Sequence, residues 1–266
     1  MTPNDISSAF RHARLAATPL AGYPGDTVPA TLSSAYAVQQ LSIAAWPDRV
    51  VGWKVAAIQP QWRDAYPDER LCGPVFSKSL IVAGDATVDV AVIQGGYAAA
   101  EAEFALRIGD GFPLHTRFES AAELRPFVAA VHAAVELAGS PLPNLSALGP
   151  GAVISDFGNN TGLVIGLALV DFFEREPGDW PAETSVNGAV CGSGSAERIP
   201  GGVLAALLFL ANSLASRGDT LRAGDWVSTG ASTGVHPVRV GDLVEVRFDG
   251  RPALSLRVRE AAPRSL

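Results

Sequence analysis

The stretch from residue 97 to residue 108 constrains the fold more than any other part of the chain. Successive side chains of a β-strand point to opposite faces, so a strand here places Phe104 and Leu106 on one face. Glu101 and Glu103 then share the other face, with their Cα atoms about 6.5 Å apart. The sequence therefore predicts a strand with one face against a core and two carboxylates on the other.

Two carboxylates on one face repel each other. If that face is partly buried, the repulsion is relieved either by protonating one carboxylate or by binding a cation, and Mg²⁺ prefers oxygen ligands of this kind. The alternative is an ordinary solvent-facing strand that carries two glutamates.

Two further residues bear on this choice. Alternation over residues 131–137 places Glu136 and His132 on one face of a second strand. The chain has 20 basic residues, of which only Lys54 and Lys78 are lysines, and Lys54 alternates with the large apolar side chains of a strand over residues 50–56. A solvated strand lysine is the alternative for Lys54.

The remaining pattern predicts an α+β fold, because the helical segments gather towards one end of the sequence and strands fill the rest. Apolar spacing and caps predict helices at 5–17, 31–45, from Ser120 (with a capping box to Glu123), and 201–216. Strands are predicted at 50–56, 97–108, 131–137, 162–170, 225–229, in a hairpin across Asn187-Gly188, and in a hairpin over 242–258 across Asp249-Gly250.

Composition narrows the class of partner. The 266 residues carry a formal net charge of −7, which gives no electrostatic footprint for nucleic acid or an anionic membrane and favours a small-molecule site. The longest apolar run, 203–211, is far shorter than the ~20 residues of a membrane span. A polar amino terminus and two isolated cysteines, Cys72 and Cys191, predict a cytoplasmic protein without a secretion signal.

Three tempting motifs lack the context that they need. Residues 230–234 match G-x-S-x-G, but Pro237 follows where the nucleophile elbow must open a helix. Residues 192–197 place Glu197 where a dinucleotide loop needs its third glycine. The four histidines show no metal-ligand spacing, and the first thirty residues carry no motif that bears on function.

Taken in order, the short motifs of the chain resemble those of the 2-keto-4-pentenoate hydratases and, more loosely, of the 2-oxo-3-hexenedioate decarboxylases and fumarylacetoacetate hydrolases. The resemblance spans about residues 31 to 258. It is carried by Ala35-Tyr36-Ala37-Val38-Gln39, Val51-Gly52-Trp53-Lys54-Val55, Glu101-Ala102-Glu103, Val135-Glu136-Leu137-Ala138-Gly139-Ser140, Asn187-Gly188, Leu210-Ala211-Asn212, Arg222-Ala223-Gly224-Asp225 and 228–234.

This resemblance implies a mixed β-roll of the fumarylacetoacetase carboxy-terminal type, spanning 81–266, after a helical amino-terminal region, 1–80, that includes the strand with Lys54. It also implies a homo-oligomer, which could associate with a partner enzyme of the same pathway.

The resemblance further implies a site for a small 2-oxo acid. Glu101, Glu103 and Glu136 match the family's ligands of Mg²⁺ or Mn²⁺, and Lys54 matches its active-site lysine. Val55 and Thr233 match positions that line the substrate pocket.

Two departures from the family pattern affect the reaction. Hydratases commonly carry an acidic residue in an Asp-Phe-Gly stretch, and this chain has Leu71-Cys72-Gly73 there. Where the family often has Asp-Asn-Ala-Ser, this chain has Asp156 followed by Phe157, so Asn159 or Asn160 would have to supply the missing amide. Asp156 is a candidate catalytic residue, and a turn-capping carboxylate is its alternative.

The resulting hypothesis is a divalent-metal-dependent lyase, a hydratase of a 2-hydroxydienoate or 2-oxoenoate from aromatic catabolism. The alternatives are a 2-oxo-3-hexenedioate decarboxylase or acylpyruvate hydrolase of the same fold, and a catalytically silent oligomeric partner.

Overall fold

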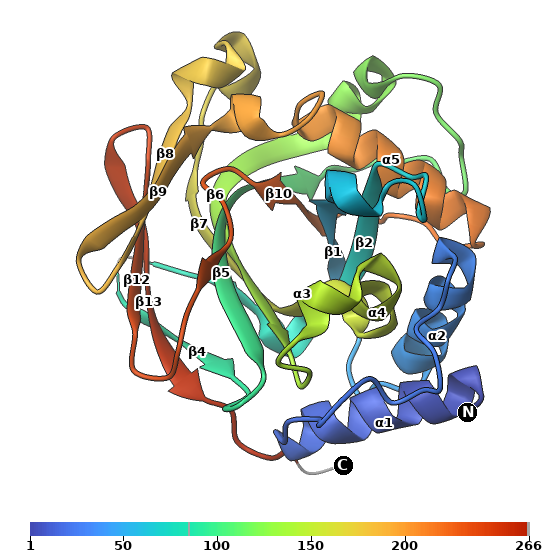
Figure 1. Cartoon of the computed structure of the whole chain (residues 1–266). Coiled ribbons are helices and arrows are strands. Elements are labelled where there is room, and N and C mark those ends of the chain that lie inside the picture. The colour runs from blue at the N-terminus through green and yellow to red at the C-terminus, as the bar shows by residue number, and fades with distance from the viewer. Residues whose placement is uncertain (85, 265–266) are drawn as a thin grey trace.

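The computed structural model describes residues 1–84 and 86–264. Eight of the described strands form sheet A, in the spatial order β2-β1-β10-β5-β6-β7-β3 with β11 paired to β5 (Figure 1). The strands of sheet A are β1 (Val50–Ala57), β2 (Arg70–Phe76), β3 (Leu80–Val82), β5 (Tyr97–Ile108), β6 (Val128–Ser140), β7 (Asn160–Ala168), β10 (Trp226–Ala231) and β11 (His236–Pro237).

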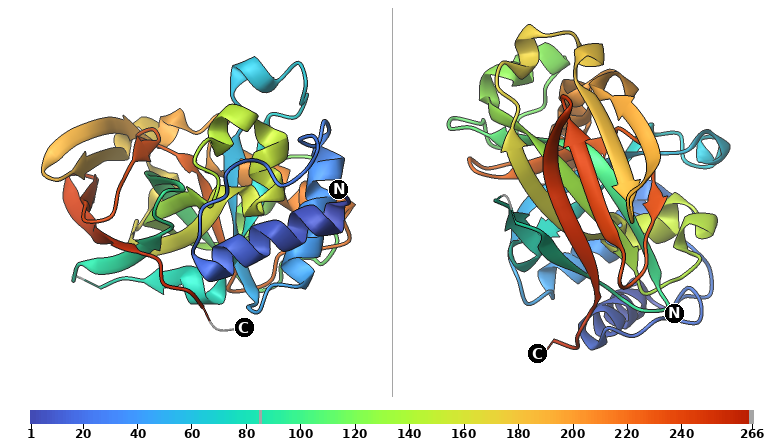
Figure 2. Two further views of the ribbon diagram at one scale, coloured as in Figure 1. Left: turned by 60° about the horizontal axis from the view of Figure 1, so that its bottom comes forward. Right: turned by 90° about the vertical axis from the view of Figure 1, so that its left-hand side faces the viewer.

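Sheet B has five strands in the order β4-β13-β12-β8-β9 and lies across sheet A, as the right-hand view of Figure 2 shows. Its strands are β4 (Val88–Val92), β8 (Pro181–Val186), β9 (Ala189–Ser195), β12 (Leu243–Phe248) and β13 (Arg251–Glu260). Mixed sheets with a few helices make this an α+β fold, as the sequence predicts.

The helices begin where the sequence offers caps. Thr2 caps α1 (Pro3–Ala16) with a capping box to Asp5, and Thr31 caps α2 (Leu32–Ala44). The other α-helices are α3 (Leu145–Leu148), α4 (Pro150–Ser155) and α5 (Val203–Ser216). Short 3₁₀ helices are η1 (Pro60–Trp62), η2 (Ser77–Ser79), η3 (Ala121–Phe127), η4 (Phe157–Asn159), η5 (Phe172–Glu174), η6 (Pro177–Asp179) and η7 (Ala196–Arg198).

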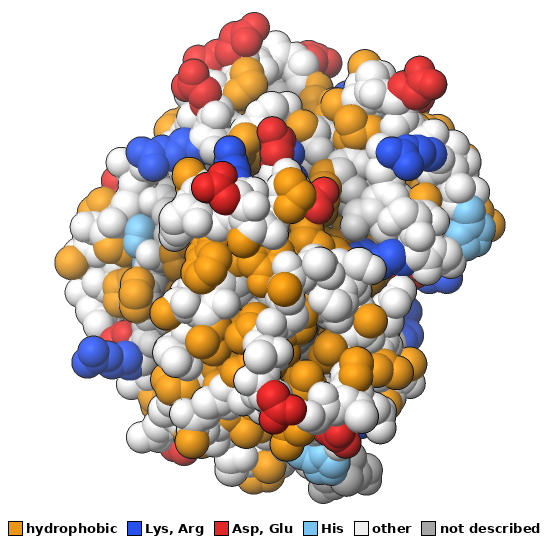
Figure 3. Space-filling view, turned by 45° about the vertical axis from the view of Figure 1, so that its right-hand side comes forward, with side chains coloured by type: hydrophobic (Ala, Val, Ile, Leu, Met, Phe, Trp, Pro, Cys, Tyr) orange, Lys and Arg blue, Asp and Glu red, His pale blue; other side chains and the backbone are white. Residues whose placement is uncertain are grey.

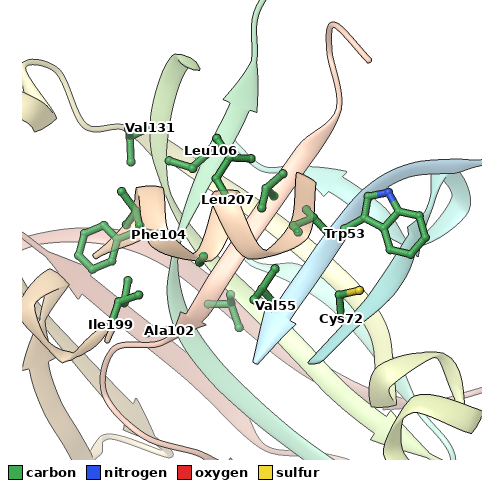
Figure 4. Packing of buried hydrophobic residues seen from close by; sticks show 14 of the residues in the cluster. Trp53, Val55, Cys72, Ala102, Phe104, Leu106, Val131, Ile199 and Leu207 are labelled. Atoms are coloured by element: carbon green, nitrogen blue, oxygen red, sulfur yellow. The ribbon is translucent and has the colours of Figure 1, made fainter. Parts of the chain in front are cut away.

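The main core lies on one face of sheet A. Ala102, Phe104 and Leu106 of β5 all point into it, and Figure 4 shows Phe104 and Leu106 beside Leu207 of α5. Phe104 also meets Phe248 of sheet B edge to face at 5.1 Å. Full burial of one such aromatic side chain contributes about 1.5–3 kcal/mol, so this alternation fixes which face of β5 turns inward.

Glu101 and Glu103 occupy the other face of β5. Ala105, two residues further along that face, packs against Ala134 and Trp226 in a second, smaller apolar cluster. Both faces of sheet A are therefore covered, and the alternative of a solvent-facing pair of glutamates is wrong.

Most predicted elements form where the sequence places them. The predicted strands at 50–56, 97–108 and 131–137, both hairpins and the buried helix at 201–216 are confirmed to within three residues. The segment after Ser120 has the predicted capping box with Glu123 but is a 3₁₀ helix with Pro126 inside it. A proline in an α-helix removes a hydrogen bond and collides with the preceding turn.

The sequence analysis missed β2, β3, β4 and β11. Gly73 and Pro74 in β2 are typical of turns, but β2 is an edge strand of sheet A, where proline is tolerated. Strand β1, from the predicted amino-terminal region, pairs in parallel with β10. The division of the chain into an amino-terminal region, 1–80, and a catalytic β-roll, 81–266, stays a prediction.

Candidate metal centre

Three glutamates from two neighbouring strands meet on the face of sheet A opposite the Phe104 side chain. Strands β5 and β6 are antiparallel, and their register sets Glu101 directly opposite Glu136. Glu103 lies two residues along the same face of β5, and one carboxylate oxygen from each of the three lies within 4.8 Å of the other two. Each side chain is almost fully buried. Strand pairing thus gathers the three carboxylates that the sequence analysis singled out.

Lys54 reaches this cluster from β1. Its Nζ lies 3.3 Å from Oε1 of Glu136 and donates a hydrogen bond of 3.0 Å to Oδ1 of Asn159. Only 2% of its surface is exposed, so the alternative of a solvated lysine is wrong. One ammonium against three carboxylates leaves a surplus of two negative charges when all are ionised.

The last residue of η4 and the first residue of β7 supply two amides. Asn160 donates a hydrogen bond of 3.1 Å from Nδ2 to Oε1 of Glu136, while Asn159 accepts from Lys54. Phe157, Gly158 and Asn159 all have positive φ, at 55°, 64° and 58°. The left-handed conformation costs a non-glycine residue about 1–2 kcal/mol, so the surrounding structure must hold this segment in place.

Two groups that the sequence analysis left without a role hold Glu103. The Ser228 hydroxyl and the Gly230 backbone N–H both donate to Oε2 of Glu103, the latter at 2.8 Å. Both belong to β10, within the 228–234 motif. Residues 230–234 run into β11 and open no helix, as the sequence predicts for this false nucleophile elbow.

The electrostatics of the cluster favour protonation or a bound cation. Burial and the neighbouring Glu136 raise the pKa of Glu101 to about 7. Burial, Glu136 and Glu101 raise the pKa of Glu103 well above its usual value. Burial alone would lower the pKa of Lys54, but the charges of Glu136, Glu101 and Glu103 outweigh burial and raise it.

These donors fit a hard divalent cation. Oε2 of Glu136 is buried and has no hydrogen-bond partner among the described residues, although a buried carboxylate oxygen normally has one. Mg²⁺ and Mn²⁺ prefer carboxylate oxygens as ligands. The cluster offers three carboxylates with converging oxygens, and one of these oxygens has no hydrogen-bond partner among the described residues.

Asp156 lies apart from the cluster's hydrogen bonds. Its carboxylate is wholly buried, 2.5 Å from Nε of Arg14, and accepts a hydrogen bond of 2.5 Å from the Ser140 hydroxyl. Removing one partner of a buried ion pair costs about 3–5 kcal/mol. These contacts favour a structural role for Asp156 over the predicted catalytic one.

The two residues expected to line the substrate pocket have different surroundings. The side chain of Val55 packs into the main core, as Figure 4 shows, although its backbone carbonyl faces Gly230. The Thr233 hydroxyl bonds to Thr184 at 2.8 Å and to Nε2 of His236 at 3.2 Å. Pocket-lining roles for Val55 and Thr233 stay predictions.

The surface matches the charge composition. In Figure 3, basic side chains are scattered among acidic and hydrophobic ones on the face drawn. None of the helices in the described part of the chain combines the length and the apolar character of a membrane-crossing segment.

Comparison with known proteins identifies relatives by sequence and by structure. The chain is 28% identical over 106 residues to a 4-oxalocrotonate decarboxylase of Pseudomonas sp. (strain CF600), a match that covers 40% of each protein. The chain thus aligns with less than half of that curated relative's length.

Solved structures share the fold over a greater length. The 4-oxalocrotonate decarboxylase from Pseudomonas putida G7, complexed with magnesium and adipate, superposes with a TM-score of 0.79 at 23% identity, covering 96% of this chain and 97% of that one. The fumarylpyruvate hydrolase from Pseudomonas aeruginosa, in complex with Mn²⁺ and pyruvate, gives 0.59 at 18% identity over 81% of this chain and 91% of that one.

The family model for the C-terminal domain of fumarylacetoacetate (FAA) hydrolase matches residues 50–259, which include every residue of the carboxylate cluster. The chain belongs to the fumarylacetoacetate hydrolase family.

Proposed function

We propose that this protein is a divalent-metal-dependent decarboxylase of a 2-oxo-enedioate. A candidate substrate is 2-oxohex-3-enedioate, which has the carbon skeleton of 4-oxalocrotonate. The observation that carries the proposal is the buried cluster of Glu101, Glu103 and Glu136 around Lys54, with one carboxylate oxygen unpartnered. Its relatives support the choice of substrate, because both the curated match and the structure that covers 96% of the chain are 4-oxalocrotonate decarboxylases.

Glu101, Glu103 and Glu136 would hold Mg²⁺ or Mn²⁺. Such an ion, when bound, acts as a Lewis acid that draws electrons from the oxygens of a 2-oxo acid. The two solved relatives are complexes, one with magnesium and adipate and the other with Mn²⁺ and pyruvate.

The reaction breaks one carbon–carbon bond. The distal carboxylate leaves as carbon dioxide, and the electron pair of the broken bond moves through the conjugated carbons to the 2-oxo oxygen. The product is a dienolate, which one proton converts to 2-hydroxypenta-2,4-dienoate. Lys54, fixed by Glu136 and Asn159, can hold its ammonium towards the oxygen where negative charge develops.

Leu71 favours decarboxylation over hydration. In the β1–β2 register, Gly73 is opposite Lys54 and Leu71 is opposite Ala56, so strand alternation sets Leu71 on the Lys54 face. This is the position where hydratases commonly carry an acid. Hydration needs a group that activates water, whereas loss of carbon dioxide needs none.

The hydratase remains the second candidate, because the same cluster could stabilise the enolate that precedes addition of water. A silent oligomeric partner is disfavoured, because such a protein has no use for four converging buried charges. Homo-oligomer formation, association with a partner enzyme and a cytoplasmic location stay predictions of the family resemblance.

The test is proton NMR of the purified protein with Mg²⁺ and either 2-oxohex-3-enedioate or 2-hydroxypenta-2,4-dienoate. We expect the enedioate to lose carbon dioxide and the dienoate to persist. Conversion of the dienoate to 4-hydroxy-2-oxopentanoate would instead identify a hydratase.

EDTA and Glu101→Gln are the controls. Glutamine keeps the size of Glu101 but supplies no charge, so we expect Mn²⁺ binding and turnover to be lost together. Turnover that survives in both controls would contradict a metal-dependent mechanism, and no reaction in either tube would reject both substrates.

A further inference from the structure

Arg14 of α1 ties the amino-terminal helix to the segment that carries Asn159 and Asn160. Its Nε lies 2.5 Å from Oδ1 of Asp156, and its Nη2 donates to Oδ2 of Asp156 at 3.0 Å. Nη1 donates to the backbone carbonyl of Asn160 at 3.0 Å, and Nη2 also donates to that of Gly139 at 2.9 Å. One guanidinium therefore joins the end of β6 to the start of β7.

The segment that Arg14 holds is the single 3₁₀ turn η4, and its backbone is unusual. Phe157, Gly158 and Asn159 are all left-handed, and a Cβ added to Gly73 of β2 would overlap the Phe157 carbonyl. The segment therefore packs closely against β2 and is also hydrogen-bonded, through Asp156 and Asn160, to Arg14.

Its two amides reach the candidate metal centre. Asn159 accepts from Lys54, and Asn160 donates to the same oxygen of Glu136 that Lys54 approaches. A displacement of this segment would therefore change the orientation of both Lys54 and Glu136.

We infer that Arg14 is a positioning residue of the site: through Asp156 and the Asn160 backbone, it holds Asn159 and Asn160 where they orient Lys54 and Glu136. The inference rests on the proposed function. If it holds, α1 contributes to the geometry of the site although it lies outside residues 50–259, the region that the family model matches.

Arginine is required by this geometry. Its rigid fork reaches both oxygens of Asp156 and two carbonyls from different strands, whereas a lysine ammonium is a single point of attachment. The positive charge of a lysine would pair with Asp156 but would not also donate a hydrogen bond to the carbonyl of Asn160.

The experiment compares Arg14→Met and Arg14→Lys with Arg11→Met as the matched control. Arg11 lies on the same helix, and its hydrogen bonds to other described residues go to the Ser7 hydroxyl and the Ala45 carbonyl, both at 3.4 Å. Mn²⁺ affinity is measured without substrate, by the electron paramagnetic resonance signal of free Mn²⁺, on protein that is folded by circular dichroism.

We expect Arg14→Met to weaken Mn²⁺ binding about 10-fold, as loss of groups that orient metal ligands does, and Arg14→Lys to weaken it severalfold. Arg11→Met should bind as the wild type does. If Arg14→Met does not fold, Arg14→Lys, which keeps the charge beside Asp156, decides the question.

A mutant cycle with a variant that carries both Asn159→Ala and Asn160→Ala separates positioning from general stabilisation. If Arg14 acts through these two amides, adding Arg14→Met to that variant weakens Mn²⁺ binding no further. Effects that multiply would overturn the inference, as would an Arg14 variant that melts at a lower temperature yet binds Mn²⁺ with unchanged affinity.

The side-chain amide NMR signals of Asn159 and Asn160 distinguish this inference from the proposed function. Arg14→Lys should shift both signals, and Arg11→Met should shift neither. A wild-type protein that binds no Mn²⁺ rejects the proposed function, and the amide signals then still decide the inference: unchanged signals in Arg14→Lys overturn it.

Discussion

At the scale of single residues, Lys54 shows what burial does to a charge. It lies among three carboxylates and an amide, and Lys78, the other lysine of the chain, is exposed on the short helix after β2. A buried ammonium is tolerated only when it is paired, and Glu136 provides that pairing at 3.3 Å. The same ammonium is then available where substrate charge develops.

Lys54→Met should lower kcat by about 10²-fold or more, because one preorganised donor near a developing oxyanion contributes that much. The measurement is decarboxylation of 2-oxohex-3-enedioate under saturating Mg²⁺. Lys78→Met is the matched control and should leave kcat unchanged. Equal activity in the two variants would remove Lys54 from the mechanism.

At the scale of elements, the contact between β2 and η4 shapes the site. Gly73 pairs with Lys54 across β1 and β2, and its missing side chain leaves room for the carbonyl of Phe157. The strained turn at 157–159 therefore depends on a glycine in a neighbouring strand.

Gly73→Ala should reduce the free energy of unfolding by about 1–3 kcal/mol, because a new methyl group must displace either the strand or the turn. Gly22→Ala is the matched control, since a Cβ there meets nothing within 4 Å. Urea denaturation measures both. A Gly73→Ala protein as stable as Gly22→Ala would show that the turn adjusts without cost.

At the scale of the whole molecule, the buried carboxylates link stability to pH. The pKa of Glu101 is about 7 in the folded chain against an ordinary 4.5. Between these values the folded state holds a proton that the unfolded state has released, so stability falls as pH rises.

We therefore expect the metal-free protein, in EDTA, to melt at a progressively lower temperature from about pH 5 to pH 7.5. Burial lowers the pKa of His236, which acts in the opposite direction, so the comparison is made with Glu101→Gln. That variant should show a flatter dependence on pH. Parallel curves for the two proteins would contradict a raised pKa at Glu101.

Added Mg²⁺ should raise the melting temperature more at pH 8 than at pH 5.5, because the ion and the protons compete for the same carboxylates. Differential scanning fluorimetry measures both conditions, and Ca²⁺ serves as a comparison ion. An increase that is independent of pH would place the binding of Mg²⁺ elsewhere.

The amino-acid sequence alone specified which side chains share a face of each strand, and it pointed to the family. Alternation in 97–108 separated Phe104 from Glu101 and Glu103, because a strand has a period of two, and apolar burial then chose which face turned inward. The ordered short motifs indicated the family that the match over 50–259 established. Strand β2 was missed because glycine and proline are typical of turns. Proline is nevertheless tolerated in a strand at the edge of a sheet, as β2 is.

Burial of the second face, in contrast, follows from the three-dimensional packing of the strands. Pairing of β5 with β6 and of β1 with β10 brought Lys54 to Glu136, residues 82 positions apart in the chain. Arg14 carried no motif, and its contact with Asp156 spans 142 positions. Local patterns record which way a side chain points, whereas the distance between two charges far apart in the sequence depends on how the strands pair.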